Sequence, residues 1–396
     1  MTEWIECTLD KLGEIVGGAT PSTKCEDYYG GSIPWITPKD LSSFKGRYIT
    51  SGERNITEKG LASCSAQMMP KDAVLFTSRA PIGYVAIASQ SVCTNQGFKS
   101  IVVNEKADPL FVYYLLKYNK DAIEAMGSGT TFKEVSGKTM RAVKVRIPLE
   151  VSYQKRIAAA LDSLDTKIEN NERINDNLQQ QAQAIYRERF ERVPSEDLPS
   201  GWRVVALGDV ATISNKSFNP LKEAEKMLEH YSIPAFDEAR FPVFEPSTSI
   251  KSNKFVIDAS CFMISKLNPT TKRVWKPYCL TENAVCSTEF IVYKAKDESI
   301  TDFLYSVIDS GSFSDFMCSH VTGSTGSRQR TTPSETLAYE LTLPSEGDLA
   351  EFQSLVSPMY AQMRINAIEN DKLKRLRDSL LPKLMSGELD VSGIQL

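Results

Sequence analysis

The feature of this sequence that most constrains its fold is an internal duplication with a period of about 195 residues. Its clearest part is a charged helical stretch, residues 171–178, which matches residues 366–373 in the placing of two asparagines and a leucine. Further landmarks keep nearly the same offset: Gly127-Ser128 with Gly323-Ser324, Ile147-Pro148 with Leu343-Pro344, and Trp4 before Leu12-Gly13 with Trp202 before Leu207-Gly208. The repeating unit is therefore a globular stretch of about 145 residues followed by a helix.

Each copy ends in a long helical pattern with a single seam of alternating four- and three-residue steps. Such steps are typical of the a and d positions of a coiled coil. The first seam is Ile157, Leu161, Leu164, Ile168, Asn171, Asn175, Leu178, Ala182 and Ile185, and the second is Phe352, Val356, Met359, Met363, Asn366, Asn370, Leu373, Arg377 and Leu380. Each helix is expected to have about 30 residues and a length near 45 Å.

A helix with one apolar seam and charged flanks needs a partner helix of similar length to be stable in water. The asparagines at matched seam positions predict that the two helices pair with each other, because a buried asparagine lowers stability but fixes register and partner. The predicted pairing residues are Asn171, Asn175, Leu178, Asn366, Asn370 and Leu373. The alternative is a seam that is merely solvated at these positions.

The globular stretches contain short β-prone segments separated by Gly, Pro, Asn and Ser, with one helical pattern in each copy. Strands are expected at residues 73–77, 85–88, 100–103, 261–264 and 290–293, and helices at 110–117 and 303–308. The predicted fold class is α+β, with two mixed α/β domains in tandem, each followed by a long helix. The domains are residues 1–150 and 193–346, and the helices are 151–192 and, with a tail, 347–396.

Composition excludes several classes of protein. The eight cysteines form no Cys-x-x-Cys pair and only two histidines are present, so we expect reduced thiols, no metal site and a cytoplasmic protein. Acids lie among the first fifteen residues, and no run of about 18 uncharged apolar residues occurs, so no membrane contact is expected. The net charge of -4 argues against a uniformly basic nucleic-acid binder. Any binding to nucleic acid must therefore come from local clusters of positive charge.

No motif of an enzyme that acts on DNA is complete in this sequence. Gly137-Lys138-Thr139 ends like a phosphate-binding loop, but Phe132 stands where that loop requires glycine. Asn268-Pro269 is followed by two threonines instead of the proline and aromatic residue of adenine methyltransferases, and Asp165-x-Lys167 lies on the first long helix. We therefore expect a chain with no catalytic residues.

Positive charge gathers in two stretches despite the acidic total. Residues 126–148 carry five lysines and arginines against Glu134, and residues 251–276 carry six against Asp258. Such patches suit phosphate contacts, while Arg, Lys, Asn, Gln, Ser and Thr side chains of the same surface read base edges. Two glycine-containing loops at matched positions, residues 127–133 and 323–330, are the favoured reading loops, and flexible solvated loops are the alternative.

The candidate DNA-binding residues come from these stretches and from β-prone segments that end in a cation. They are Trp35, Lys39, Arg79, Asn95, Gln96, Lys99, Thr130, Lys133, Lys254, Lys266, Asn268, Lys272, Arg273, Arg328, Gln329 and Arg330. Arg79 and Lys266 occupy matching places in the two copies, where an ordinary surface turn is the alternative. Trp35 lies close to two isoleucines and fits the core as well as base stacking, and Trp275 fits a surface or a buried position.

The repeat, the two helices and several local segments resemble the type I restriction and modification specificity subunits over essentially the whole chain. The segments are Ile33-Pro34-Trp35-Ile36-Thr37, Leu198-Pro199-Ser200-Gly201-Trp202, residues 250–255, Ser265-Lys266-Leu267-Asn268-Pro269, Cys286-Ser287-Thr288-Glu289-Phe290 and residues 380–389. The resemblance implies two target-recognition domains that each read one half of a split double-stranded DNA site. It also implies that an antiparallel helix pair holds them apart in a pseudo-two-fold repeat.

The same resemblance implies partners. Two methyltransferase (M) subunits and the restriction (R) subunits would join the chain, with S-adenosylmethionine, ATP and Mg in those partners and no cofactor in this chain. A rod near 45 Å suits a half-site spacing of about 34 to 36 Å. The alternatives are the specificity half of a combined restriction-methylation enzyme, and a coiled-coil scaffold that binds no DNA.

Overall fold

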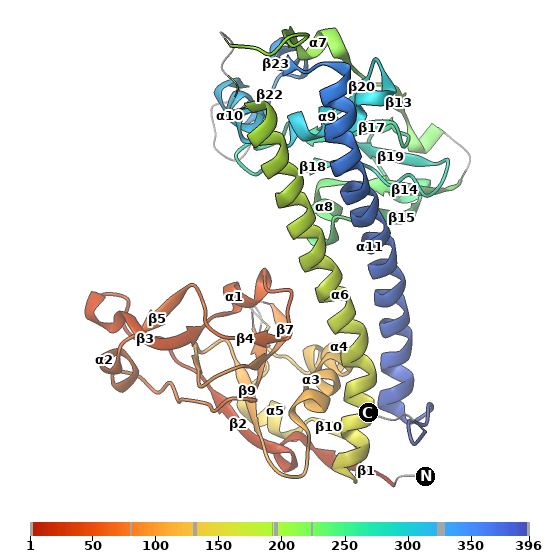
Figure 1. Ribbon diagram of the computed structural model, residues 1–396. Coiled ribbons are helices and arrows are strands. Elements are labelled where there is room, and N and C mark those ends of the chain that lie inside the picture. The colour runs from red at the N-terminus through yellow and green to blue at the C-terminus, as the bar shows by residue number, and fades with distance from the viewer. Residues whose placement is uncertain are drawn as a thin grey trace. The chain divides into compact units, whose positions relative to one another are not determined.

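The computed structural model describes residues 3–79, 81–129, 133–191, 193, 197–222, 225–322 and 329–393. Internal contacts divide the chain into two units, residues 1–169 with 372–396, and residues 170–371. Each unit combines a globular domain with part of both long helices (Figure 1).

The first unit is built around a five-stranded sheet with strand order β2-β9-β6-β7-β4. A three-stranded sheet, β5-β3-β8, and an antiparallel pair, β1-β10, complete it. The elements are β1 Trp4–Thr8, β2 Gly13–Gly17, β3 Tyr29–Ile36, α1 Pro38–Ser42, β4 Tyr48–Ile49, β5 Arg54–Ile56, α2 Glu58–Ala62, β6 Val74–Ser78, β7 Ile82–Ala88, β8 Cys93–Thr94, β9 Lys99–Val103, α3 Pro109–Tyr118, α4 Lys120–Ala125, α5 Gly137–Ala142, β10 Lys144–Pro148 and α6 Val151–Tyr186. Strand β6 is buried along its whole length, as its unbroken run of β-prone residues requires.

The second unit repeats this plan with a four-stranded sheet, β12-β20-β17-β18, and a five-stranded sheet, β13-β16-β19-β14-β15. Two antiparallel pairs, β11-β23 and β21-β22, complete it. The elements are β11 Arg203–Ala206, α7 Leu207–Val210, β12 Ala211–Ile213, β13 Ser217–Phe218, β14 Met227–Tyr231, α8 Ile233–Ala239, β15 Val243–Pro246, β16 Lys254–Val256, β17 Cys261–Ser265, β18 Val274–Trp275, β19 Ala284–Ser287, β20 Phe290–Ala295, α9 Thr301–Ile308, α10 Gly311–Ser319, β21 Val321–Thr322, β22 Arg330–Thr331, β23 Glu340–Leu343 and α11 Glu346–Ser386.

The internal repeat is visible in the strand pairings. Strands β2-β9-β6-β7 correspond to β12-β20-β17-β18, and the pair β1-β10 corresponds to β11-β23. The parallel pair β3-β8 recurs as β14-β19. The predicted α+β class, with two mixed domains that are each followed by a long helix, is confirmed.

The long helices α6 and α11 lie antiparallel to each other within each unit (Figure 1). In the second unit, Asn171 Nδ2 donates to Asn370 Oδ1 at 2.9 Å, and Asn366 Nδ2 donates to Asn175 Oδ1 at 2.8 Å. In the first unit, Arg377 of α11 forms an ion pair of 2.7 Å with Asp165 of α6. The predicted pairing of the two helices is therefore confirmed, and polar contacts mark its register.

The ends of both helices complete the cores of the domains. Helix α6 buries Ile157 and Leu161 in the first core, and helix α11 buries Phe352 and Val356 in the second. The seam between these ends buries less apolar surface, because Leu178 and Leu373 are only partly buried. Hydrophobic burial thus fixes each helix to the domains, while asparagine contacts in the second unit fix helix to helix.

Candidate nucleic-acid interface

In the first unit, three backbone segments meet at the end of β6. The Ser78 N–H donates to the Gly97 carbonyl at 2.7 Å, and the Val135 N–H donates to the Ser78 carbonyl at 2.9 Å. Ser78 is fully buried. We call residues 77–79, 97–98 and 134–135 the β6 corner; backbone hydrogen bonds hold it at the end of the middle strand of the sheet.

Charged side chains of both signs lie at the β6 corner. The Glu134 carboxylate lies 3.6 Å from Arg79 Nη1 and 3.6 Å from Lys99 Nζ. Lys99 and Arg141 both lie beside Gly137, the first residue of α5. Three cations and one acid make this corner locally positive, which suits contact with a polyanion.

The turn before β9 presents a second group of predicted residues. Asn95 Oδ1 accepts a hydrogen bond from the Gly97 N–H at 2.8 Å, so this side chain shapes the turn. Gln96 is exposed and accepts a hydrogen bond from the Thr20 hydroxyl. Lys39 on α1 is exposed and forms an ion pair of 2.7 Å with Glu53, which raises the pKa of Lys39 through their hydrogen bond. Gln96 and Lys39 are therefore accessible, whereas the Asn95 side chain stabilises the turn.

The second unit contains an equivalent corner at the end of β17. The Lys266 N–H donates to the Glu289 carbonyl at 2.9 Å, and the Thr331 N–H donates to the Lys266 carbonyl at 3.1 Å. Arg330 Nε and Nη2 each donate to one carboxylate oxygen of Glu289 at 2.9 Å. This two-point bond raises the pKa of Arg330 and fixes the planes of both groups. We call residues 265–267, 289–290 and 330–331 the β17 corner.

Asn268 extends the β17 corner into the next turn. Its backbone has a φ of 48°, in the left-handed region that asparagine tolerates better than most residues. Its N–H donates to the Gln329 carbonyl at 2.9 Å, which ties the two predicted residues together. Its side-chain Oδ1 is buried and has no hydrogen-bond partner among the described residues. Because this atom is buried, the contact of Asn268 with Gln329 is that of its backbone.

Two predicted contact residues belong to the interior instead. Trp35 is 6% exposed, packs with Ile33 and Ile56, and donates from Nε1 to the Ala19 carbonyl at 3.0 Å, so its ring is not available for base stacking. Lys254 is 5% exposed, and its Nζ bonds to the Ser252 hydroxyl at 2.6 Å. Both predictions are wrong because burial removes these side chains from the surface. Trp275, which the sequence left open, is also buried.

The side chains of Lys272 and Arg273 pair with acids that do not belong to the β17 corner, although the Arg273 carbonyl accepts from the Ser265 N–H at 2.9 Å. Lys272 Nζ lies 3.0 Å from the Asp309 carboxylate, next to the end of α9. Arg273 bonds Asp237 of α8 at 2.6 Å and 2.9 Å. These contacts bind the turn before β18 to the neighbouring helices α8 and α9.

The remaining predicted residues lie at or near the glycine-containing loops. Lys133 is exposed beside the β6 corner, with its side chain near Gly127. Thr130 and Arg328 lie outside the described residues. Glu134 and Glu289 lie at the two corners but are not among the predicted residues, because the prediction rested on local excesses of positive charge and the uncharged side chains beside them. The signal that could have found them is a lone acid within a cationic stretch, as Glu134 is.

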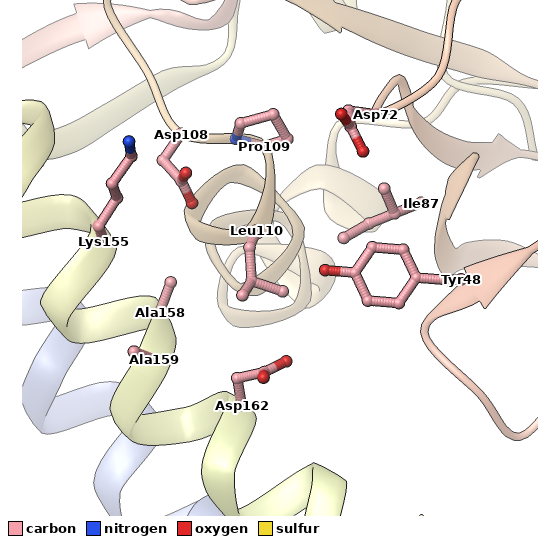
Figure 2. Close-up of a pocket in the computed structure, with 10 residues that line it drawn as sticks. All are labelled: Tyr48, Asp72, Ile87, Asp108, Pro109, Leu110, Lys155, Ala158, Ala159 and Asp162. Carbon is pink, nitrogen blue, oxygen red and sulfur yellow. The ribbon is translucent and has the colours of Figure 1, made fainter. Parts of the chain in front are cut away.

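A hollow of about 450 Å³ beside α6 in the first unit has the opposite charge. Its lining includes Asp72, Asp108 and Asp162 with a single cation, Lys155, and Figure 2 shows the Tyr48 side chain facing the same space. Burial raises the pKa of Asp162, which lies 3.3 Å from the guanidinium of buried Arg47. Three carboxylates repel phosphate, so the lining of this hollow does not suit contact with a DNA backbone.

The described residues contain no cluster of three or more His, Cys, Asp or Glu side chains that could hold a metal ion. No helix within the described ranges is long and apolar enough to cross a membrane. The two corners offer hydrogen bonding and charge, from residues of paired strands and the turns beside them.

Comparison with known proteins identifies the family. Residues 1–180 match the family described as type I restriction modification DNA specificity domain. The type I restriction enzyme MjaIX specificity subunit of Methanocaldococcus jannaschii is 32% identical, over 99% of this chain and 95% of its own length. A putative type I restriction enzyme MjaX specificity subunit of the same organism is 31% identical over 42% of this chain and 37% of its own length.

The fold is also similar to a solved structure. The crystal structure of a type I restriction-modification system S subunit from M. genitalium matches with a TM-score of 0.60, covering 97% of this chain and 96% of that one at 16% identity. This likeness extends across both units and both long helices. Together with the full-length relative from Methanocaldococcus jannaschii, it leads to one conclusion: the chain belongs to the family of type I restriction enzyme specificity subunits.

Proposed function

We propose that this chain is the DNA-reading subunit of a type I restriction-modification complex, and that each unit reads one half of a split site in double-stranded DNA. The observation that carries the proposal is the repetition of one charged strand corner, at β6 and at β17, in a chain of this family. A protein that reads two different half-sites needs two domains with the same backbone arrangement and different side chains at the contact positions. A scaffold that binds no DNA has no need of them.

The helix pair supplies the second part of the proposal. The contacts of Asn171 with Asn370 and of Asp165 with Arg377 fix the register of α6 against α11 in each unit. A fixed register gives a fixed length of rod, and a fixed rod sets the number of unread base pairs between half-sites. The pair therefore acts as the spacer of the complex.

The chain itself carries out no catalytic step in this proposal. Two M subunits that use S-adenosylmethionine bind to it and methylate adenine, and R subunits that use ATP and Mg bind for cleavage. Support comes from family membership and from the sequence, in which no motif of such an enzyme is complete. The complex works in the cytoplasm, where its DNA is.

The test is to co-express the full chain with the methyltransferase subunit encoded beside it, in a host free of other modification systems, and to map methylated adenines across the genome. The expected result is a split motif with a fixed unread gap. Host cells with the methyltransferase subunit alone are the control. Absence of methylation from a complex that assembles would reject the proposal in favour of a scaffold.

A further inference from the structure

The β6 and β17 corners share one backbone frame, residue by residue. Thr77 and Phe98 form a bridge that recurs as the pairing of Ser265 with Phe290. The bridge of Arg79 with Glu134 recurs as that of Leu267 with Arg330. The amide hydrogen bonds of Ser78 and Val135 recur at Lys266 and Thr331. Gly97 therefore corresponds to Glu289, and Glu134 corresponds to Arg330.

The positions of this shared frame fall into two groups. Two positions are alike in burial, because Phe98 and Phe290 are both buried, as are Val135 and Thr331. Other positions differ: Gly97 and Glu134 stand where the second corner has Glu289 and Arg330. Ser78 and Arg79 stand where it has Lys266 and Leu267. The same backbone arrangement therefore carries different charged side chains in the two corners, which fits two sites that bind different ligands.

An acid within each corner shows what kind of ligand fits. Glu289 is held by two hydrogen bonds from Arg330, and Glu134 lies between Arg79 and Lys99. A carboxylate repels a phosphate, so cations that contact only the DNA backbone would have no use for it. In the major groove, however, a carboxylate accepts from the cytosine amino group, and a guanidinium donates to guanine.

We propose that these acid–cation groups are the base-reading elements of the two domains, and that the Glu289–Arg330 pair recognises a C·G base pair in the second half-site. The group of Glu134, Arg79 and Lys99 reads a base pair in the first half-site through the same frame. This inference rests on the proposed DNA-reading function and names the base edges that it uses. The two-point bond holds Glu289 in one orientation before DNA arrives, which favours discrimination.

The experiment uses the full chain assembled with its methyltransferase partner and a DNA library randomised across both half-sites. Bound DNA is selected and sequenced for the unaltered complex and for Glu134→Gln and Glu289→Gln, which keep the size of each side chain. Asp258→Asn is the matched control, because Asp258 pairs with Lys294 near the opposite end of the β17–β20 strand pair. Circular dichroism and assembly with the partner check folding.

The expected result is a double dissociation. Glu289→Gln should lose roughly tenfold or more of its preference at one base pair of one half-site, and Glu134→Gln should do the same in the other half-site alone. The unread gap should stay unchanged in both, and Asp258→Asn should select the unaltered motif.

Two outcomes would overturn the inference while leaving the proposed function intact. One is an unaltered motif from both glutamine variants. The other is a folded, assembled variant that binds neither its site nor random DNA, because loss of one base contact should spare the phosphate contacts. Failure of the unaltered complex to select any split motif would instead reject the proposed function itself.

Discussion

Asn171 and Asn370 form a side-chain hydrogen bond of 2.9 Å between α6 and α11, and both residues are almost fully buried. Asn171 Nδ2 also donates to Glu369 at 2.7 Å. Leucine at either seam position would bury more apolar surface, so these asparagines lower the attainable stability and fix the register of the pair.

Replacing one member of this pair should destabilise the chain. Asn171→Leu leaves the buried Asn370 amide without this partner, at a cost of about 1 to 3 kcal/mol in the free energy of unfolding. The double variant Asn171→Leu with Asn370→Leu should regain most of that loss. Urea unfolding measures both, and Asn177→Ala on the exposed face of α6 is the control. A loss in the double variant equal to the sum of the losses in Asn171→Leu and Asn370→Leu alone would show that the two amides are not coupled.

A second prediction concerns the buried carboxylate of Glu229. It accepts hydrogen bonds from the Tyr231 hydroxyl at 2.6 Å and from the Leu280 and Thr281 N–H groups at 3.0 Å and 2.7 Å. Glu229→Gln places a donor where these donors converge, so the free energy of unfolding should fall by about 1.5 to 3 kcal/mol. Glu238→Gln on the exposed side of α8 should change it by less than about 0.5 kcal/mol. If both variants change the free energy of unfolding by a similarly small amount, the hydrogen bonds that Glu229 accepts do not stabilise the fold.

The elements predictable from the sequence are those with a repeated or periodic signal. The seam asparagines recur at one offset, and burial of strands β6 and β17 follows from their runs of apolar residues. Both signals report local chain geometry, which sequence periodicity encodes directly. The helix pairing and the position of both corners were therefore accessible without coordinates.

The contacts at the corners were not accessible in this way. The sequence aligns Arg79 with Lys266. The backbone hydrogen bonds show instead that Lys266 is the equivalent of Ser78, and Leu267 the equivalent of Arg79. Residue type alone does not say which amide pairs with which carbonyl, and a shift of one residue turns a side chain to the other face of a strand. The burial of Lys254 was also not predicted. Its ammonium group is hydrogen-bonded by the Ser252 hydroxyl and by backbone carbonyls of its own turn, and no acid in the sequence marks this arrangement.

A third prediction concerns pH. Burial lowers the pKa of His230, whose Nδ1 bonds Glu245 at 2.7 Å and whose Nε2 has no hydrogen-bond partner among the described residues. The unfolded chain then binds a proton more readily than the folded chain. The free energy of unfolding should therefore fall as the pH drops below about 6.5, the ordinary pKa of histidine.

His230→Gln should flatten this pH dependence in unfolding curves recorded between about pH 5 and pH 7.5. The only other histidine, His320, is exposed, so His320→Gln controls for the loss of a histidine. Stability that rises on acidification in the unaltered chain but not in His230→Gln would give the opposite sign and reject the assignment.

A fourth prediction tests the helix pair as a spacer. Seven residues inserted after Glu169 in α6 separate Asp165 from Asn171, whose partners Arg377 and Asn370 lie on the uninterrupted α11. One set of contacts must then break, so this variant should unfold at lower urea concentration. A matching insertion after Asp371 in α11 restores both sets, because a heptad adds almost two full turns to each helix. The paired insertion lengthens the rod by about 10 Å, which should widen the unread gap of the methylated motif by about three base pairs. A paired variant that is stable and methylates the original motif would show that something other than the helices sets the gap.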